Sequence, residues 1–107
     1  KDYLIYFKKV LNTNEIKNIL SFNNAYTIKL YYHILKQKND RRWIVSIKEI
    51  KYILNLLDKY KLYGHLKDKV IIPTIEEINN KTNFKIILNE IKDKKRVVKI
   101  EFIIKEK

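Results

Sequence analysis

The sequence predicts an α+β fold in which amphipathic helices precede a β-hairpin at the C-terminal end. Up to about Asn80, apolar residues recur at the helical spacings of three and four, whereas from Phe84 onward they alternate with a period of two. The order of these patterns is helix, short strand, helix, turn, helix and strand pair. That order is typical of a winged helix-turn-helix, with the C-terminal β-hairpin as its wing.

The length and composition favour a single domain. The 107 residues, 46% of them hydrophobic, are enough to bury a core. A flexible linker needs several Gly, Pro or Ser residues, and the chain has one Gly and one Pro. We therefore expect one winged helix domain over residues 1–107, with a core from about 12 to 104. Because Lys1 is not preceded by Met, we expect a fragment of a larger protein.

The N-terminal part is predicted to hold a short apolar run and two helices. The run Tyr3–Phe7 fits an entering strand or the end of a preceding element. A short helix is predicted from Thr13, with Thr13 or Asn14 as its cap. A longer helix, from about Asn24 to Lys38, is indicated by an apolar stripe at helical spacing. The residues of this stripe are Tyr26, Leu30, Tyr31, Ile34 and Leu35.

The middle of the chain is predicted to hold a short strand and a capped helix. The polar connection 38–42 leads into the β-favouring run 43–45. Ser46 and Glu49 have the spacing of a capping box, with Ser46 as the N-cap and Glu49 reaching back to its N–H group. An apolar face follows, formed by Ile47, Ile50, Ile53, Leu54 and Leu57. We expect this helix to end near Asn55, which tolerates the left-handed backbone of a C-terminal cap.

The second helix of the helix-turn-helix is predicted over His65 to Asn80, after a turn from Leu57 to Gly64. Gly64 is expected to permit a sharp change of direction at the helix start. Pro73 would cost about 3 kcal/mol inside a straight helix, so we expect a bend there. The inner side is predicted to be formed by Leu66, Val70, Thr74 and Ile78, with Ile71 and Ile75 at its border.

The predicted wing follows Lys81. Phe84, Ile86 and Leu88 alternate with polar residues along the first strand. The second strand shows the same alternation at Val98, Ile100, Phe102 and Ile104. The four charged residues 92–95 separate the two runs, so we expect a hairpin with a charged tip.

The net charge of +12 favours a polyanionic partner, nucleic acid first. An AT-rich genome that fills exposed positions with Lys and Asn is the alternative explanation. The chain has no Cys, and its two His residues, His33 and His65, lie far apart in the sequence, so neither a metal site nor another cofactor is predicted. No apolar run approaches the about 18 residues of a membrane span, and no signal peptide is visible, so no membrane partner is expected.

The predicted second helix carries the candidate residues for base contact, because this helix of the motif enters the major groove. Lys69 can donate to guanine O6 and N7, and Ile72 can touch a thymine methyl group. His65 can donate to a base or a phosphate, while Asp68 either accepts from cytosine N4 or holds Lys69 or Lys61 in place. A solvated charged face accounts for the same residues. Glu76 and Glu77 repel phosphate, so the reading half is expected to end near the proline.

Other basic residues are candidates for phosphate contact, which sets register and affinity rather than sequence preference. Three lysines flank the reading face: Lys59, Lys61 and Lys67. The wing offers a further set for the minor groove or the backbone: Lys92, Lys94, Lys95 and Arg96. A basic hairpin tip also keeps a sheet edge soluble. Arg41 and Arg42 can approach phosphate near the N-terminus of the Ser46 helix, or can simply pair with Asp40 or Glu49.

The aromatic residues and the carboxylates do not point to catalysis. Most aromatic side chains lie at core spacings, namely Tyr26, Tyr31, Tyr52, Phe84 and Phe102, while Tyr60 and Tyr63 in the turn are open to a role in stacking. A tyrosine that nicks DNA would need a nearby His-x-His pair, which the sequence lacks. Paired carboxylates, a Gly-rich phosphate loop and a nucleophile with its base are not recognisable either, so we predict that the protein is not an enzyme.

Several short motifs follow one another in a specific order. The first long helix carries Ala25-Tyr26 and Leu30-Tyr31, and the next carries Ser46-Ile47-Lys48-Glu49-Ile50. Later come Leu54-Asn55-Leu56, Lys59-Tyr60, Leu66-Lys67, Val70-Ile71, Pro73, Glu77-Ile78-Asn79 and Phe102. In this order and spacing, the chain from about Leu11 to Ile104 resembles the C-terminal winged helix domain of iteron-binding plasmid replication initiator proteins.

The resemblance implies a non-enzymatic initiator in the bacterial cytoplasm. Such a protein binds direct repeats in the double-stranded DNA of a plasmid origin, helps to open the duplex and recruits host replication proteins. It uses two winged helix domains in tandem, whereas one is visible here, and Asn55 stands where Gly is common. The alternative is a winged helix module for protein interaction or dimerisation, with Tyr3–Phe7 as an exposed strand edge. We expect a monomer or a weak dimer.

Overall fold

The protein is represented by a computed structural model that describes residues 12–107, so the run Tyr3–Phe7 lies outside the described residues. Four elements precede the helix-turn-helix: α2 (Thr13–Ser21), α3 (Ala25–Lys36), the 3-10 turn η1 (Lys38–Asp40) and β1 (Arg42–Ser46). The motif itself consists of α4 (Ile47–Ile53), α5 (Tyr63–Leu66), the π-helical turn η2 (Lys67–Ile71) and α6 (Ile72–Lys81). The last three are continuous, and they are called the reading helix below. The hairpin strands are β2 (Phe84–Asp93) and β3 (Arg96–Glu106).

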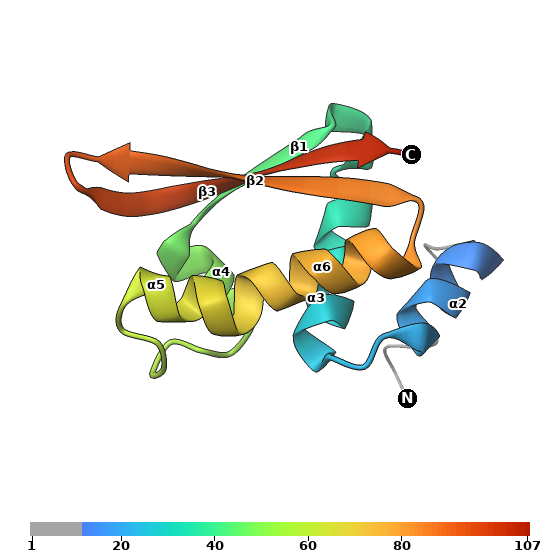
Figure 1. The fold of residues 1–107 in the computed structure, drawn as a ribbon, viewed down its shortest axis with the longest axis horizontal. Coiled ribbons are helices and arrows are strands. Elements are labelled where there is room, and N and C mark those ends of the chain that lie inside the picture. Colours follow the sequence, from blue (N-terminus) through green and yellow to red (C-terminus); the bar gives the residue numbers. More distant parts are fainter. Residues whose placement is uncertain (1–11) are drawn as a thin grey trace.

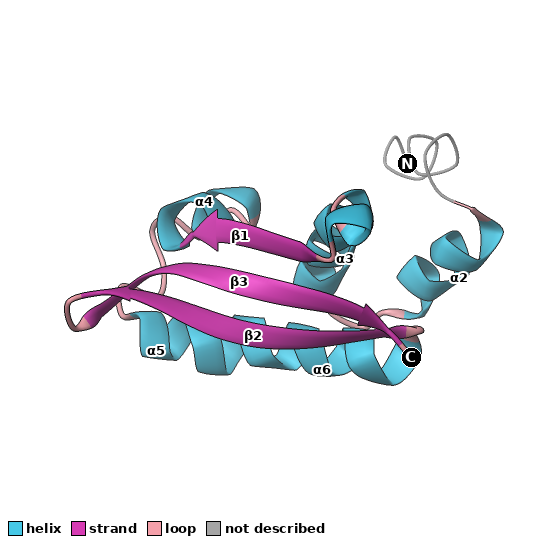
Figure 2. Ribbon diagram, turned by 90° about the horizontal axis from the view of Figure 1, so that it is seen from above, coloured by secondary structure: helices cyan, strands magenta, loops and turns pink. Residues whose placement is uncertain are grey.

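The three strands form an antiparallel sheet in the order β1-β3-β2. Figure 1 shows the helices on one face of this sheet, and in Figure 2 the strands lie in front of them. Across the sheet, Phe102 of β3 lies opposite Trp43 of β1 and Leu88 of β2. The predicted α+β winged helix arrangement is therefore confirmed, with β3 as the central strand.

The core lies between the covered face of the sheet and the helices. The strands contribute Val45, Ile86, Ile100, Phe102 and Ile104, and the helices contribute Leu30, Ile34, Ile50, Leu66 and Ile78, among others. Full burial of such a side chain is worth about 1.5 to 3 kcal/mol. The predicted inner stripe of the reading helix is confirmed. Ile71 and Ile75, expected at its border, are buried as well, because the helix packs against both α3 and β2.

Asparagine side chains begin the first two described helices. The cap of α2 is Asn12 rather than the predicted Thr13 or Asn14: its Oδ1 accepts from the N–H of Glu15 at 2.8 Å, and Glu15 Oε1 accepts from the N–H of Asn12 at 2.9 Å. This reciprocal pair is a capping box. Asn24 caps α3 through Tyr26 N–H at 2.9 Å. This helix ends at Lys36, two residues before the predicted end, because η1 takes up the following residues.

The α4 helix begins and ends largely as predicted. Ser46 Oγ accepts from the N–H of Glu49 at 3.0 Å, although the return bond of the predicted capping box is not formed in the described structure. At the other end Asn55 has a φ of 59°, the left-handed conformation that was expected. The N–H groups of Asn55 and Leu56 donate to the carbonyls of Tyr52 and Lys51, at 3.1 and 2.7 Å. These two bonds form a Schellman motif.

The reading helix differs from the prediction at its start and at Pro73. It begins at Tyr63, two residues earlier than expected, and Gly64 lies in its first turn without a positive φ. The sharp change of direction falls instead at Tyr60, whose φ is 55°. Before Pro73 the helix widens into the π turn η2, in which the N–H of Ile72 donates to the carbonyl of Lys67. A π turn accommodates a residue that has no N–H to donate, so the expected interruption takes this form.

Candidate nucleic-acid interface

The reading helix presents one polar face away from the core. His65, Asp68 and Lys69 are exposed on it, and Ile72 is half-buried beside them. Their spacing of three and four residues aligns them opposite Leu66 and the rest of the buried stripe. The structure therefore brings all four predicted candidates for base contact onto one face. This face combines N–H donors, a carboxylate acceptor and an apolar surface, the three kinds of group that distinguish bases in the major groove.

A groove of about 740 Å³ lies between the wing, the turn and the starts of α4 and α5, and is called the basic groove. Its charged lining residues are Lys48, Lys51, Lys61, Lys95 and Arg96. Among the described residues that line it there is no carboxylate, so no lining group neutralises these cations. Leu57, Leu62, Val97 and Val98 provide apolar surface between them. Leu57, expected in the core, is half exposed here.

Lys48 and Lys51 were not among the predicted contacts. On the sequence they look like the solvated side of a capped helix. The signal that could have found them is their spacing of three residues after the Ser46 cap, which places both on the same side of α4. Lys51 Nζ donates to the carbonyl of Tyr60 at 3.3 Å, so this lysine is held against the turn.

The start of the reading helix also faces the basic groove. Leu62, at the N-cap position, offers no side-chain cap, while Tyr63 and Gly64 line the groove. The first N–H groups of a helix have no acceptor within the helix itself. Together with the partial positive charge of the helix end, they add to the attraction of the lysines for an anion.

The wing tip is shorter than predicted and fully charged. Strand β2 extends to Asp93, which pairs with Arg96, so the turn consists of Lys94 and Lys95 alone. Lys94 has a φ of 60°. The register shifts between Ile91 and Lys92, and this bulge precedes the tip. The four predicted wing residues are all exposed, and two of them, Lys95 and Arg96, line the basic groove.

A comparison with protein families matches residues 46–104 to the family described as initiator Rep protein, WH2. This range contains the helix-turn-helix, the basic groove and the wing, and it makes up more than half of the chain. The chain belongs to this family. The predicted resemblance to replication initiators is confirmed, and so is the assignment of the fold as their winged helix.

Two relatives place this Rep WH2 domain within longer proteins. A replication initiation protein of Escherichia coli is 26% identical over 93 residues, which cover 82% of this chain and 29% of the relative. The chain thus spans less than a third of that relative's length. A solved structure described as the Pi initiator protein in complex with iteron DNA has a TM-score of 0.71 at 22% identity. The match covers 86% of this chain and 43% of the Pi initiator chain, and it supports the fold assignment.

Two of the lysines predicted to flank the reading face of the Rep WH2 domain have different surroundings from those expected. Lys67 Nζ lies 2.9 Å from Glu90 Oε2 on β2, so its charge is neutralised by the base of the wing. Lys59 is exposed in the turn but does not line the basic groove. Of the three lysines in this set, Lys61 is the one that the fold brings to the groove.

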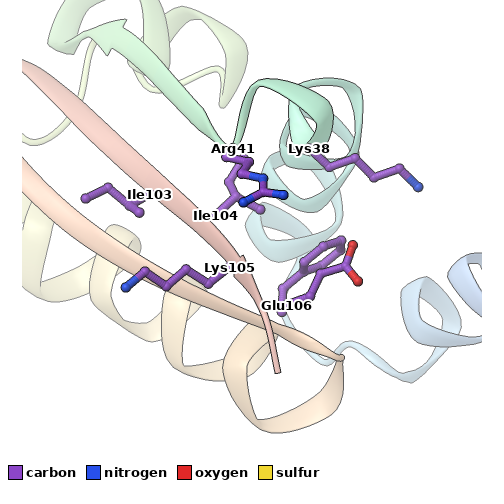
Figure 3. Close-up of a pocket in the computed structure, with 7 residues that line it drawn as sticks. Lys38, Arg41, Ile103, Ile104, Lys105 and Glu106 are labelled. Carbon is purple, nitrogen blue, oxygen red and sulfur yellow. The ribbon is translucent and has the colours of Figure 1, made fainter.

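The arginines expected near the start of α4 lie at the opposite end of β1. The strand runs from Arg42 to Ser46, and Arg42 pairs with Glu101 at 3.4 Å rather than with the predicted Asp40 or Glu49. Arg41 has a φ of 61° and lines a separate cavity of about 630 Å³ with Lys38 and Lys105. Figure 3 shows Lys38 and Lys105 extending in opposite directions, so these cations do not converge on one point. Both arginines lie away from the basic groove.

Glu77 was predicted, with Glu76, to repel phosphate beyond Pro73, but its carboxylate is paired within the protein. Its Oε2 accepts from the N–H of Asn23 at 2.7 Å and from Lys81 Nζ at 2.9 Å. Burial acts to raise the pKa of Glu77, but the bonds from Asn23 and Lys81 stabilise the carboxylate more strongly, and the pKa is lowered to about 2. Glu77 thus ties α6 to the connection between α2 and α3. Glu76 is exposed, as the prediction required.

The aromatic side chains are mainly structural. Tyr31, Phe84 and Phe102 are buried as predicted, whereas Tyr52 is 72% exposed because Ile50 and Leu54 form the inner side of α4. Tyr60 and Tyr63, left open by the sequence, are half-buried and line the basic groove.

Residues 12–107 contain no helix that is long and apolar enough to cross a membrane. The same residues contain no cluster of three or more His, Cys, Asp or Glu side chains suited to a metal ion.

Proposed function

We propose that this domain binds double-stranded DNA in a sequence-specific manner, at direct repeats of a plasmid replication origin. The observation that carries the proposal is the juxtaposition of an outward-facing reading face with the basic groove at the base of the wing. A base-reading surface and a phosphate-binding surface are thereby joined through one helix. The family of the chain supports the same function, and so does the iteron DNA bound to the solved Pi initiator.

In the proposed complex the reading helix lies in the major groove. Lys69 donates to guanine O6 and N7, Ile72 contacts a thymine methyl group, and His65 donates to a base or a phosphate. Asp68 accepts from cytosine N4 or orients Lys69. The basic groove and the wing hold the sugar-phosphate backbone. The apolar residues of the groove pack against the deoxyribose. The groove residues would set affinity and the helix residues would set sequence preference.

The wider role is that of a non-enzymatic part of a longer initiator in the bacterial cytoplasm. The E. coli relative is a replication initiation protein more than three times as long as the matched region. Recruitment of host replication proteins would depend on the remainder of such a protein as well as on this domain.

Selection from a randomised duplex library, followed by titration at physiological salt, tests the proposal. The expected result is an enriched motif that binds about a thousandfold more tightly than a scrambled duplex of the same composition. If the lysines and arginines of the protein neutralise about six to ten phosphates, the affinity should fall by about 10³ to 10⁵ between 50 and 200 mM salt. Equal affinities for the enriched and scrambled duplexes would exclude base readout.

A second candidate is self-association through the sheet edge. Strand β1 lies at one edge of the sheet, and Ile44 on it is 42% exposed. An unpaired edge is a template for a further strand. Sedimentation velocity without DNA distinguishes this function, because a monomer at every protein concentration would rule it out.

A further inference from the structure

The reading helix is tied to strand β2 at two points. At the first, the Asn79 side chain donates to the carbonyl of Ile86 at 3.2 Å and accepts from the N–H of Ile86 at 2.7 Å. Strand β2 is an edge strand within residues 12–107, so among these residues no further strand pairs with its outward backbone groups. The amide of Asn79 takes the place of that strand, and it fixes α6 against the part of the hairpin farthest from the wing tip.

The second tie is the carboxylate of Glu90. Lys67 Nζ lies 2.9 Å from Glu90 Oε2, with the two side chains 36% and 27% exposed. Tyr63, four residues before Lys67, lies on the same side of the helix, and burial together with the nearby carboxylate raises the pKa of its phenol. The ion pair with Lys67 lowers the pKa of Glu90, so the group is a carboxylate at neutral pH. One acidic side chain of the wing thus holds the reading helix through Lys67.

The position of Glu90 along the strand matters for the wing. It immediately precedes Ile91, after which the register shifts and the hairpin projects to Lys94. At about 3.3 Å per residue the tip lies about 13 Å beyond Glu90. A small rotation of the hairpin about Glu90 would therefore displace the cations at the wing tip. The tie at Ile86 lies four residues before Glu90, on the side away from the tip.

Glu90 also changes the charge that the helix presents. Lys67 lies one helical turn after Tyr63, which lines the basic groove, so a free ammonium group there would add to the positive charge beside the groove. Each additional phosphate contact raises sequence-independent affinity and steepens the salt dependence by about 0.9. Paired with Glu90, Lys67 is withheld from this contact.

We propose that Glu90 is a positioning residue that sets the DNA specificity of this domain, by fixing the wing against the reading helix and by withholding Lys67 from phosphate. This inference rests on the proposed function. Loss of the carboxylate frees a cation and loosens the wing, and both effects favour non-specific over specific binding.

The test compares the parent with Glu90→Gln on the enriched duplex and on a scrambled duplex over 50 to 200 mM salt. The expected result is about a threefold rise in affinity for scrambled DNA, a salt slope steeper by about 0.9, and a specificity ratio reduced about tenfold. In the double variant with Lys67→Gln, the affinity for scrambled DNA should return to the parental value. Glu106→Gln, the same charge change at the far end of β3, should leave the ratio unchanged.

Three outcomes would overturn the inference. A specificity ratio for Glu90→Gln within twofold of the parental ratio would show that Glu90 does not set specificity. A lowered melting temperature with an unchanged ratio would assign it a purely structural role. An equal change in the specificity ratio for Glu106→Gln would show that the effect comes from net charge and not from the position of Glu90. Failure of the proposed function is distinguishable, because the parent itself would then bind both duplexes equally.

Discussion

The basic groove makes a quantitative prediction for the double substitution Lys48→Gln and Lys51→Gln. Both lysines line a groove that has no carboxylate among its described lining residues. A lysine that neutralises one phosphate contributes about 0.9 to the slope of log affinity against log salt. The double variant should therefore have a slope shallower by about 1.8. Over a fourfold rise in salt this corresponds to about a 12-fold smaller loss of affinity than in the parent.

The assay is fluorescence anisotropy with the enriched and scrambled duplexes at four salt concentrations. Both duplexes should be weakened alike, because backbone contacts carry no base information. The matched control is Lys85→Gln with Lys105→Gln, an exposed pair that lie opposite each other on β2 and β3, away from the groove. Because Lys51 donates to the carbonyl of Tyr60, a melting curve of each variant is needed to confirm folding.

Two results would refute the reasoning about the groove. If the groove pair and the control pair changed the slope equally, the effect would be one of net charge rather than of position. If the double variant lost its preference for the enriched duplex, the groove would take part in base readout.

Further predictions concern the reading face, the carboxylate of Glu77 and the single glycine. Lys69→Ala should relax sequence preference, whereas Lys94→Ala should weaken all duplexes alike and lower the salt slope by about one; identical behaviour in titrations would contradict the separation of reader and wing. Glu77→Gln should lower the free energy of unfolding by about 2 kcal/mol at pH 7. Because the folded-state pKa of Glu77 is lowered to about 2, this contribution is complete above about pH 4.5 and is lost as the pH falls toward 2. Denaturation at pH 7 and pH 3 should show the difference shrinking, and a constant difference would disprove the assignment. Gly64→Ala should raise stability by about 0.5 to 1 kcal/mol, since Gly64 is helical and its Cβ would meet nothing within 4 Å; a lower melting temperature would contradict this.

Much of the fold was predictable because its signals are local. The Ser46 cap, the left-handed Asn55 and the change of period near Lys81 each depend on residues a few positions apart. The same holds for the reading face, since a helix that buries Leu66 at regular spacing must turn Lys69 outward. The predicted helix starts were in error by one or two residues. Asn12 caps α2 where Thr13 and Asn14 were also suitable caps, and the reading helix starts at Tyr63, just before Gly64.

Three features of the site could not be predicted in this way, because each joins residues distant in the sequence. Lys67 meets Glu90 across the space between helix and strand, and Glu77 meets Asn23 on a connection that precedes it by 54 residues. The basic groove forms only when α4, the turn and the wing converge, which is why Lys48 and Lys51 were missed.

The sequence by itself determined the elements, their order, the face of the reading helix that points outward and the excess of positive charge. Periodicity and capping act through neighbours along the chain, so they are readable without a structure. The tertiary structure decided which of the charges are available to a ligand. It neutralised Lys67, paired Glu77 with Asn23 and Lys81, and set Arg41 and Arg42 apart. It also gathered five cations in one groove, namely Lys48, Lys51, Lys61, Lys95 and Arg96. Coulombic attraction and the desolvation of charge depend on distances in space, and packing alone sets these.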